Sequence, residues 1–232
     1  MLINSYRFAT AATDPNFAIV SLLLHGDASP LIDSSGTPKA ISAFGNAAYS
    51  TTQKKFGSGS IAFDGSGDYL TLQNISNQLT LSGDFTIESF VWLNNFSSYM
   101  TIYQSQWTTG GFILWHHLSY VNKFSFWMWN YSTTVPVLVQ SSTLTANTFY
   151  HVAITRAGNT LKMFVGGTLE ATATTSATIE MPLPYIGAYA DGSTATPFGF
   201  YLNGYVDEFR ITKGISRYNA TFTPPTAPFP DF

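Results

Sequence analysis

Carboxylates are the residues in this 232-residue chain whose type and spacing could do chemistry. Hydrolysis of a glycosidic bond needs two of them, one as general acid and one as nucleophile or base. Glu88 stands alone in FTIESF, and a strand would send the neighbours Asp207 and Glu208 to opposite faces. No Ser/His/Asp motif and no phosphate-binding glycine loop is evident. We therefore expect no catalytic residues, and a glycoside hydrolase is the disfavoured alternative.

A second pair of carboxylates frames a glycine-rich turn in FDGSGDYLTL, residues 63–72. An EF-hand calcium loop would need a different acidic spacing and a distal glutamate. Glycines supply the positive φ angles that tight turns require, and aspartates bond to nearby backbone amides. We therefore predict that Asp64 and Asp68 shape a hairpin turn and bind no metal.

Tryptophans form the other group with chemical potential, because indole rings stack on the apolar C–H faces of sugars. Alternation in KFSFWMWNY predicts one face of a strand that packs in the core, made of Phe124, Phe126 and Met128. The opposite face carries Ser125, Trp127, Trp129 and Tyr131. We expect Trp115 and His117 to stand beside this face and Trp107 to form a rim from a loop. Glycan stacking, packing against a partner chain and burial in the core all remain open for this face.

Strands must position these side chains, since alternation of period two recurs along the chain with turn residues at regular intervals. No convincing helical run of ten or more residues appears. The pattern predicts an all-β fold, a two-sheet antiparallel jelly-roll sandwich. We expect an N-terminal arm over residues 1–17, the jelly-roll domain over 18–222 and a proline-rich tail over 223–232.

Composition excludes several functions. Charged residues make up 10% of the chain and the net charge is −3, so binding of nucleic acid through a basic patch is not expected. The absence of cysteine excludes disulfides and thiolate metal sites. The longest apolar stretch, AIVSLLL, is too short to span a bilayer, and we expect no membrane insertion.

Several segments occur together in a familiar order: SLLLHGDAS, KFGSGSIAFDGSGDYLTL, GDFTIESFVWL, FYHVAITRAGNTLKMFVGGTLEATAT and GYVDEFRITKGISRYNATFTPPTAPFP. Together they resemble laminin-G-like, concanavalin A-like jelly-roll domains, of the kind found in bacteriophage tail fibre, decoration and other virion surface proteins. The resemblance covers roughly residues 18–230. It implies a non-catalytic structural or recognition module on a virion surface or outside the cell. Implied partners are other virion proteins or surface glycans, in a homo-oligomer or larger assembly.

The resemblance also implies a structural calcium ion near an early loop and the last strand. Alternation in YVDEFRI predicts Asp207 on one face with Phe209 and Ile211, where an unpaired carboxylate would be costly to bury. Hard oxygen ligands suit calcium. We expect Asp27, Asp33 and Asp207 to be its ligands. The alternative is that Asp207 pairs with an arginine or accepts backbone hydrogen bonds, while the other two only shape turns.

Overall fold

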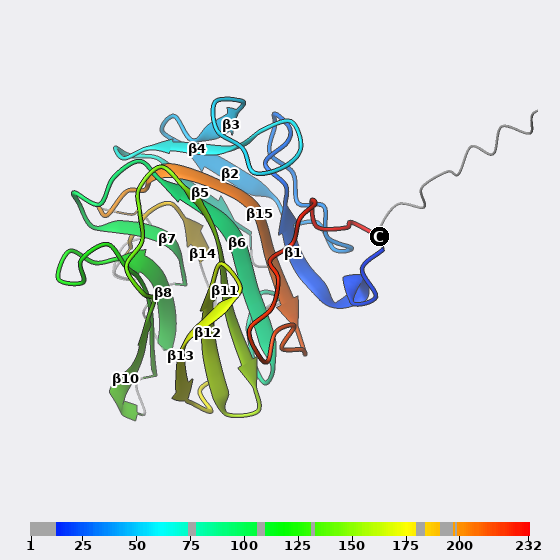
Figure 1. Ribbon diagram of the computed structural model, residues 1–232. Coiled ribbons are helices and arrows are strands. Elements are labelled where there is room, and N and C mark those ends of the chain that lie inside the picture. The colour runs from blue at the N-terminus through cyan, green and yellow to red at the C-terminus, as the bar shows by residue number, and fades with distance from the viewer. Residues whose placement is uncertain are drawn as a thin grey trace, which may run out of the picture.

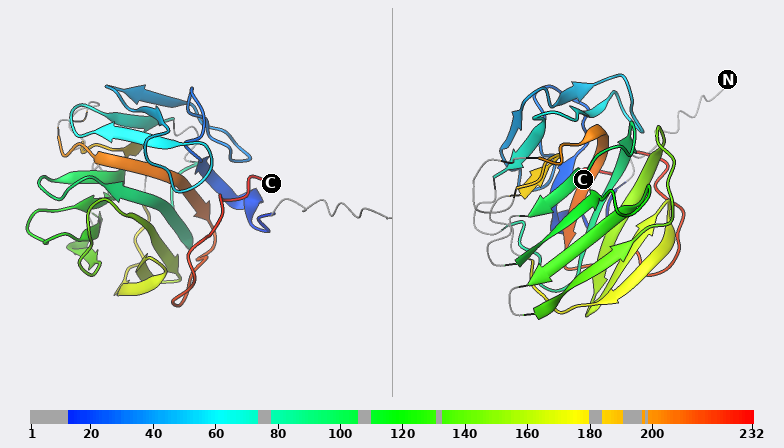
Figure 2. Two further views of the ribbon diagram at one scale, coloured as in Figure 1. Left: turned by 45° about the horizontal axis from the view of Figure 1, so that its top comes forward. Right: turned by 90° about the vertical axis from the view of Figure 1, so that its left-hand side faces the viewer.

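The computed structural model describes residues 13–73, 78–105, 110–130, 133–179, 184–190, 197 and 199–232. These residues form two stacked antiparallel sheets and one short 3-10 helix, η1 (Phe17–Ile19). Figures 1 and 2 show the two sheets curving around a common interior. The predicted all-β jelly-roll sandwich is confirmed.

The first sheet, called sheet A, has eight strands among the described residues. Its order is β13 (Thr168–Thr174), β12 (Thr160–Val165), β11 (Phe149–Ala157), β6 (Phe85–Leu93), β15 (Asn203–Lys213), β4 (Ser60–Asp64) and β3 (Ala48–Ser50), with β1 (Val20–Leu24) paired to β15. Strands β11 and β12 form a hairpin and pair from Val152↔Val165 to Ala157↔Thr160.

The second sheet, called sheet B, has seven strands in the described part of the chain. Its order is β10 (Thr133–Gln140), β9 (Phe124–Asn130), β8 (Gly110–His116), β7 (Met100–Ser105), β14 (Pro184–Ile186), β5 (Tyr69–Leu72) and β2 (Ile41–Phe44). In Figure 2 the green strands β7 to β10 run side by side, as their pairing requires.

The core lies between the sheets and takes alternate residues from each strand. On β6, Phe85, Ile87 and Val91 belong to the core, as the alternation of that segment predicts. We call the opposite side of each sheet its outer face. On the outer face of sheet A a smaller apolar cluster forms around Phe90, and it includes Phe229 of the C-terminal segment.

The last strand, β15, departs from simple alternation at a β-bulge between Asp207 and Arg210. Phe209 lies in the core, whereas Asp207 pairs with Phe90 on the outer face. The prediction that Asp207 shares a face with Phe209 and Ile211 is therefore wrong. A bulge inserts one extra residue into a strand, so the side chains after it change phase.

The inserted residue is Glu208, whose φ is +51°. Its carboxylate accepts a hydrogen bond from Phe229 N at 2.8 Å, so it too lies on the outer side of sheet A. The expectation that Asp207 and Glu208 diverge to opposite faces is therefore wrong. Both carboxylates are buried, at 1% and 0% exposure, beneath loops and the C-terminal segment.

The glycine-rich turn joins β4 of sheet A to β5 of sheet B, so it is a crossing between sheets and not the predicted hairpin. The predicted turn chemistry is confirmed. Gly65 and Gly67 have φ of 90° and 75°, and Asp64 Oδ1 accepts a hydrogen bond from Ser66 N at 2.7 Å. Asp68 accepts hydrogen bonds from the backbone N–H groups of Asp64 and Asn46.

The terminal segments meet on the outer face of sheet A, where Asp14 N donates a hydrogen bond to Phe232 O at 3.0 Å. Figure 1 shows the C-terminal segment, in red, running alongside β1 and β15. The predicted limits at residues 17 and 222 stay predictions. None of the helical structure in the described residues is long and apolar enough to cross a membrane.

Candidate functional site

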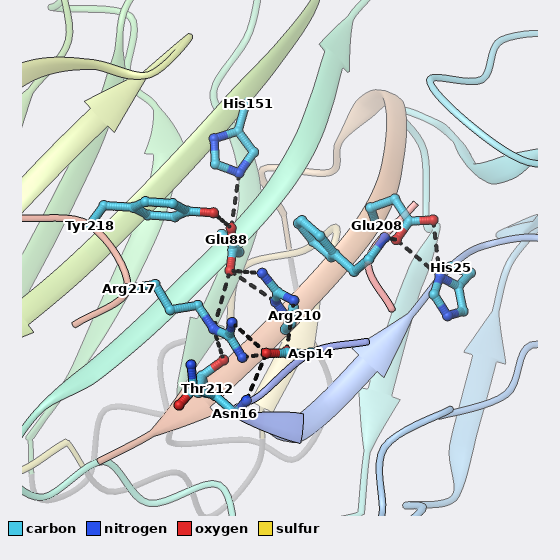
Figure 3. Close-up of polar contacts among 11 residues, drawn as sticks. Asp14, Asn16, His25, Glu88, His151, Glu208, Arg210, Thr212, Arg217 and Tyr218 are labelled. Carbon is cyan, nitrogen blue, oxygen red and sulfur yellow. Dashed lines mark hydrogen bonds and ion pairs between the residues drawn. The ribbon is translucent and has the colours of Figure 1, made fainter. Parts of the chain in front are cut away.

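Glu88 of β6, the carboxylate considered above as a catalytic residue, lies at the centre of a buried polar network (Figure 3). Its Oε1 accepts hydrogen bonds from Arg210 Nε and Nη2 at 2.9 and 2.8 Å. Its Oε2 accepts one from the Tyr218 hydroxyl at 2.8 Å and lies 3.0 Å from His151 Nε2. Burial alone would raise the pKa of Glu88, but Arg210 and His151 lower it to about 2. A fully bonded, permanently ionised carboxylate has no proton to give a leaving group.

The same network ties both terminal segments to sheet A. Asp14 bridges two guanidinium groups, with Oδ2 3.2 Å from Arg210 Nη1 and 2.6 Å from Arg217 Nη2. Burial opposes the charge of Asp14, but the hydrogen bonds of Arg217 and Asn16 help to lower its pKa. The buried Arg210 and the partly buried Arg217 are thus balanced by Asp14 and Glu88, which is the condition for keeping ions out of water. The network therefore has a structural role: it holds Asp14 and Arg217 against β6 and β15.

Two of the predicted calcium ligands hold loops through backbone hydrogen bonds. Asp27 Oδ1 accepts from Ser58 N and Gly59 N at 2.7 and 2.9 Å. Asp33 accepts from the backbone N–H groups of Leu23, Ser35 and Lys39 at 2.8–3.0 Å, and its carboxylate lies 3.6 Å from Lys39 Nζ. Both carboxylates therefore have partners without a cation.

The third predicted ligand, Asp207, is only half satisfied. Its Oδ2 accepts from Lys55 N and Phe56 N at 2.6 and 3.1 Å, whereas its Oδ1 has no hydrogen-bond partner in the described structure. Burial, with smaller contributions from the charges of Glu208 and Asp27, raises the pKa of Asp207 to about 7, against the effect of its two backbone bonds. Such a group prefers to keep its proton.

A calcium shell needs six to eight oxygen ligands around one point. Among the described residues, no group of three or more His, Asp or Glu side chains lies close enough to hold a metal ion. The set Asp27, Asp33 and Asp207 does not fit that requirement, because most of its oxygens already bind backbone amides. Calcium stays a prediction with no support from this arrangement.

The predicted tryptophan face lies on the outer face of sheet B. In the register of β8 and β9, Trp115 is opposite Ser125 and Ile113 is opposite Trp127. Neither tryptophan belongs to the core cluster, which instead takes the alternate residues of both strands: Phe112, Leu114, Phe124, Phe126 and Met128. The predicted division of β9 into a core face and an opposite face is confirmed for these residues.

The rings on this face touch one another in a continuous group. The Trp115 and Trp127 rings are stacked with centroids 6.1 Å apart, and Trp115 meets His117 edge-on at 4.6 Å. Tyr99 packs on His117 at 4.7 Å and on Phe200 at 4.8 Å. We call Tyr99, Trp115, His117, Tyr120, Trp127 and Phe200 the aromatic patch. All of them except Trp115 are partly exposed.

The aromatic patch also carries directed hydrogen-bond donors. Trp115 is 6% exposed, and its Nε1–H has no hydrogen-bond partner within the described structure. Ser119 N donates to His117 Nδ1 at 3.1 Å, so the neutral ring holds its proton on Nε2. Burial, with the nearby His116, lowers the pKa of His117, so the ring is uncharged at neutral pH. The Trp115 N–H is covered, whereas the His117 ring is partly exposed and could donate from Nε2 to a ligand hydroxyl.

Of the residues predicted for this site, the structure brings together Trp115, His117 and Trp127. Trp107 and Tyr131 lie outside the described residues, as does the side chain of Trp129. Sequence reasoning missed Tyr99, Tyr120 and Phe200. Tyr99 directly precedes the neighbouring strand β7, so strand order would have found it, whereas no spacing pattern links Phe200 to the tryptophans.

Comparison with known proteins gives a family. The Laminin_G_3 family, described as the concanavalin A-like lectin/glucanases superfamily, matches residues 64–215. No curated protein matches the chain.

Solved structures resemble the fold at low sequence identity. The receptor-binding domain of a botulinum neurotoxin C/D mosaic serotype has a TM-score of 0.67 and 16% identity, over 86% of this chain and 49% of that chain. A botulinum neurotoxin DC binding domain in complex with SialylT has a TM-score of 0.64 and 14% identity, over 93% of this chain and 49% of that chain. A third structure reports that cell entry of botulinum neurotoxin type C depends on interaction with two ganglioside molecules. Its TM-score is 0.63 and its sequence identity 16%, over 84% of this chain and 48% of that chain. This chain spans about half the length of these structures.

Proposed function

Because the chain belongs to the concanavalin A-like lectin/glucanases superfamily, we propose that it is a non-catalytic module that binds glycans through the aromatic patch. One observation carries the proposal: on the outer face of sheet B the partly exposed Trp127 ring stacks on Trp115, and the partly exposed His117 ring meets Trp115 edge-on. Sugars offer apolar faces for the rings and hydroxyl oxygens for the Nε2–H group of His117. The solved structures that share the fold include a botulinum neurotoxin binding domain in complex with SialylT and a botulinum neurotoxin type C structure whose cell entry depends on interaction with two ganglioside molecules.

Trp127→Ala tests this proposal, because the partly exposed Trp127 ring offers a stacking surface. Binding of the protein to an array of neutral and sialylated oligosaccharides should fall at least about tenfold, the loss typical of a central aromatic contact. Phe44→Ala is the matched control, because Phe44 is an exposed aromatic residue of the same sheet that stacks on Tyr69, away from the patch. Equal binding by both variants, or no bound glycan for the wild type, would refute the proposal.

Hydrolysis is the function that the observations disfavour. The buried, ionised Glu88 does not serve as an acid, and Asp207 and Glu208 lie under the loop after β3 and the C-terminal segment. We also propose that the module acts on a virion surface, alone or with copies of itself. The order of its sequence motifs and its low content of charged residues support this setting.

A further inference from the structure

A hollow lies on the outer face of sheet A, whereas the aromatic patch lies on sheet B. It has a volume of about 290 Å³ and is lined in part by Asn46, Ala62, Asp64, Asn94, Asn203 and Tyr205. The strand register explains why these residues meet: Tyr205 is opposite Ala62, and Asn203 is opposite Asp64. Small-ligand pockets begin at about 300 Å³, so the hollow has room for one compact ligand.

A chain of hydrogen bonds fixes the orientation of one amide in this hollow. Trp92 Nε1 can only donate, and it donates to Asn94 Oδ1 at 2.9 Å. The amide nitrogen of Asn94 must then donate, and it does so to Asn203 Oδ1 at 2.7 Å. The oxygen of Asn203 is thereby occupied. Its Nδ2 has no bond in the described structure and is a donor ready for a ligand.

The opposite wall supplies acceptors. Asn46 Nδ2 donates to Asp64 Oδ2 at 3.2 Å, and since a carboxylate only accepts, this leaves Asn46 Oδ1 as a second acceptor. Asp64 is exposed, and its two oxygens keep lone pairs beyond the bonds from Asn46 and Ser66. The Tyr205 hydroxyl, which has no partner in the described part of the chain, can both donate and accept. The hollow thus presents donors and acceptors side by side.

We propose that this hollow binds a neutral sugar through two adjacent hydroxyl groups. Each sugar hydroxyl donates one hydrogen bond and accepts others, which matches the amide of Asn203 and the carboxylate of Asp64, residues that are register partners on adjacent strands and line the same hollow. No lysine or arginine is among the described residues that line the hollow, and Asp64 would repel an acidic sugar. The site is separate from the aromatic patch and does not rest on the function proposed for it.

Methyl glycosides of mannose, galactose and glucose are the probes, with tetrahydropyran as a ring that lacks hydroxyl groups. Two-dimensional ¹⁵N NMR of the full chain should show shifts in the side-chain amides of Asn46 and Asn203 for at least one glycoside and none for tetrahydropyran. Asp64→Asn and Tyr205→Phe should each weaken that glycoside's binding about tenfold, because each removes a partner of a sugar hydroxyl. Tyr205→Phe deletes a hydroxyl without a protein partner, so it should leave the fold intact.

Asp231→Asn is the matched control for charge, since Asp231 is exposed near the chain end, and it should bind like the wild type. Trp127→Ala separates the two sites: it should keep the amide shifts of Asn203 even if binding at the aromatic patch is lost. The proposal is overturned if no glycoside shifts these amides, if the shifts centre only on the aromatic patch, or if both hollow variants bind with unchanged affinity.

Discussion

Asp207 makes the stability of this fold depend on pH, because burial raises the pKa of its carboxyl group. Its folded pKa is about 7, above the value of about 4 expected for an unfolded aspartate. A carboxyl group with a raised folded pKa stabilises the fold fully below its unfolded pKa. That stability is lost as the pH rises from about 4 to about 7, because the unfolded chain releases its proton first. Above pH 7 the protein holds a buried anion whose Oδ1 has no hydrogen-bond partner among the described residues.

Asp207→Asn should remove this loss. An asparagine keeps an oxygen for the N–H groups of Lys55 and Phe56 but carries no charge. The free energy of unfolding of the variant, relative to wild type, should increase by on the order of 1–2 kcal/mol between pH 4 and pH 8. Urea denaturation at several pH values measures it, with Asp231→Asn as the exposed control. A difference that is constant with pH would contradict the assignment.

At the scale of elements, the C-terminal segment acts as part of the sandwich. Phe229 is 3% exposed, its N–H donates to Glu208, and the guanidinium of Arg210 lies 3.8 Å from its ring centroid. The segment thereby covers the bulge of β15 and the ring of Phe90, which lies 6.4 Å from Phe229. Prolines in the predicted tail suit this role, since a segment that covers a sheet needs no ladder hydrogen bonds.

Phe229→Ala should therefore destabilise the protein by about 3 kcal/mol, the usual loss when a buried phenylalanine is truncated. Phe232→Ala is the matched control in the same segment: Phe232 is 54% exposed, and its loss should change stability by less than about 0.5 kcal/mol. Chemical denaturation measures both. Equal effects of the two variants would show that the segment does not contribute through Phe229.

At the scale of the whole molecule, the two ends of the described sandwich lie side by side, joined by the bond between Asp14 N and Phe232 O. Each sheet draws strands from both halves of the chain, and β15, the last strand, pairs with β1, β4 and β6. Joining residues 13 and 232 and opening the chain in a loop would therefore leave the pairing of the strands unchanged.

A circular permutant should consequently fold. Phe232 is joined to Thr13 by a short glycine-serine linker, and the chain is opened at Gly158, in the turn between β11 and β12. Its far-UV circular dichroism should match that of the wild type, with a cooperative thermal transition. A second permutant, opened at Glu208, should not fold, because it cuts the central strand β15. Failure of the first permutant together with folding of the second would contradict this account of the topology.

Much of the fold could be predicted because strand alternation is local. The core faces of β6 and β9 follow from the period of two alone, and so does the division of tryptophans from phenylalanines on β9. The bonds from Ser66 N to Asp64 and from Asp64 N to Asp68 are local as well, because each joins residues within four positions of one another. The bond from Asn46 N to Asp68 is not local and depends on the tertiary structure.

Errors arose where long-range pairing decides the outcome. The bulge at Glu208 follows from the pairing of β15 with β6, and one inserted residue moved Asp207 from the predicted face. The same turn that looked like a hairpin crosses between sheets, because the partner strands of β4 and β5 come from distant segments.

The sequence by itself thus determined the all-β class and the core faces of the long strands. Only the tertiary structure decided that Glu88 lies in an ion network, that Tyr99 and Phe200 join the tryptophans, and that Asn203 pairs with Asp64 on the adjacent strand. The physical reason is distance along the chain: alternation is set by neighbours, whereas these contacts join residues far apart in sequence that only strand register brings together.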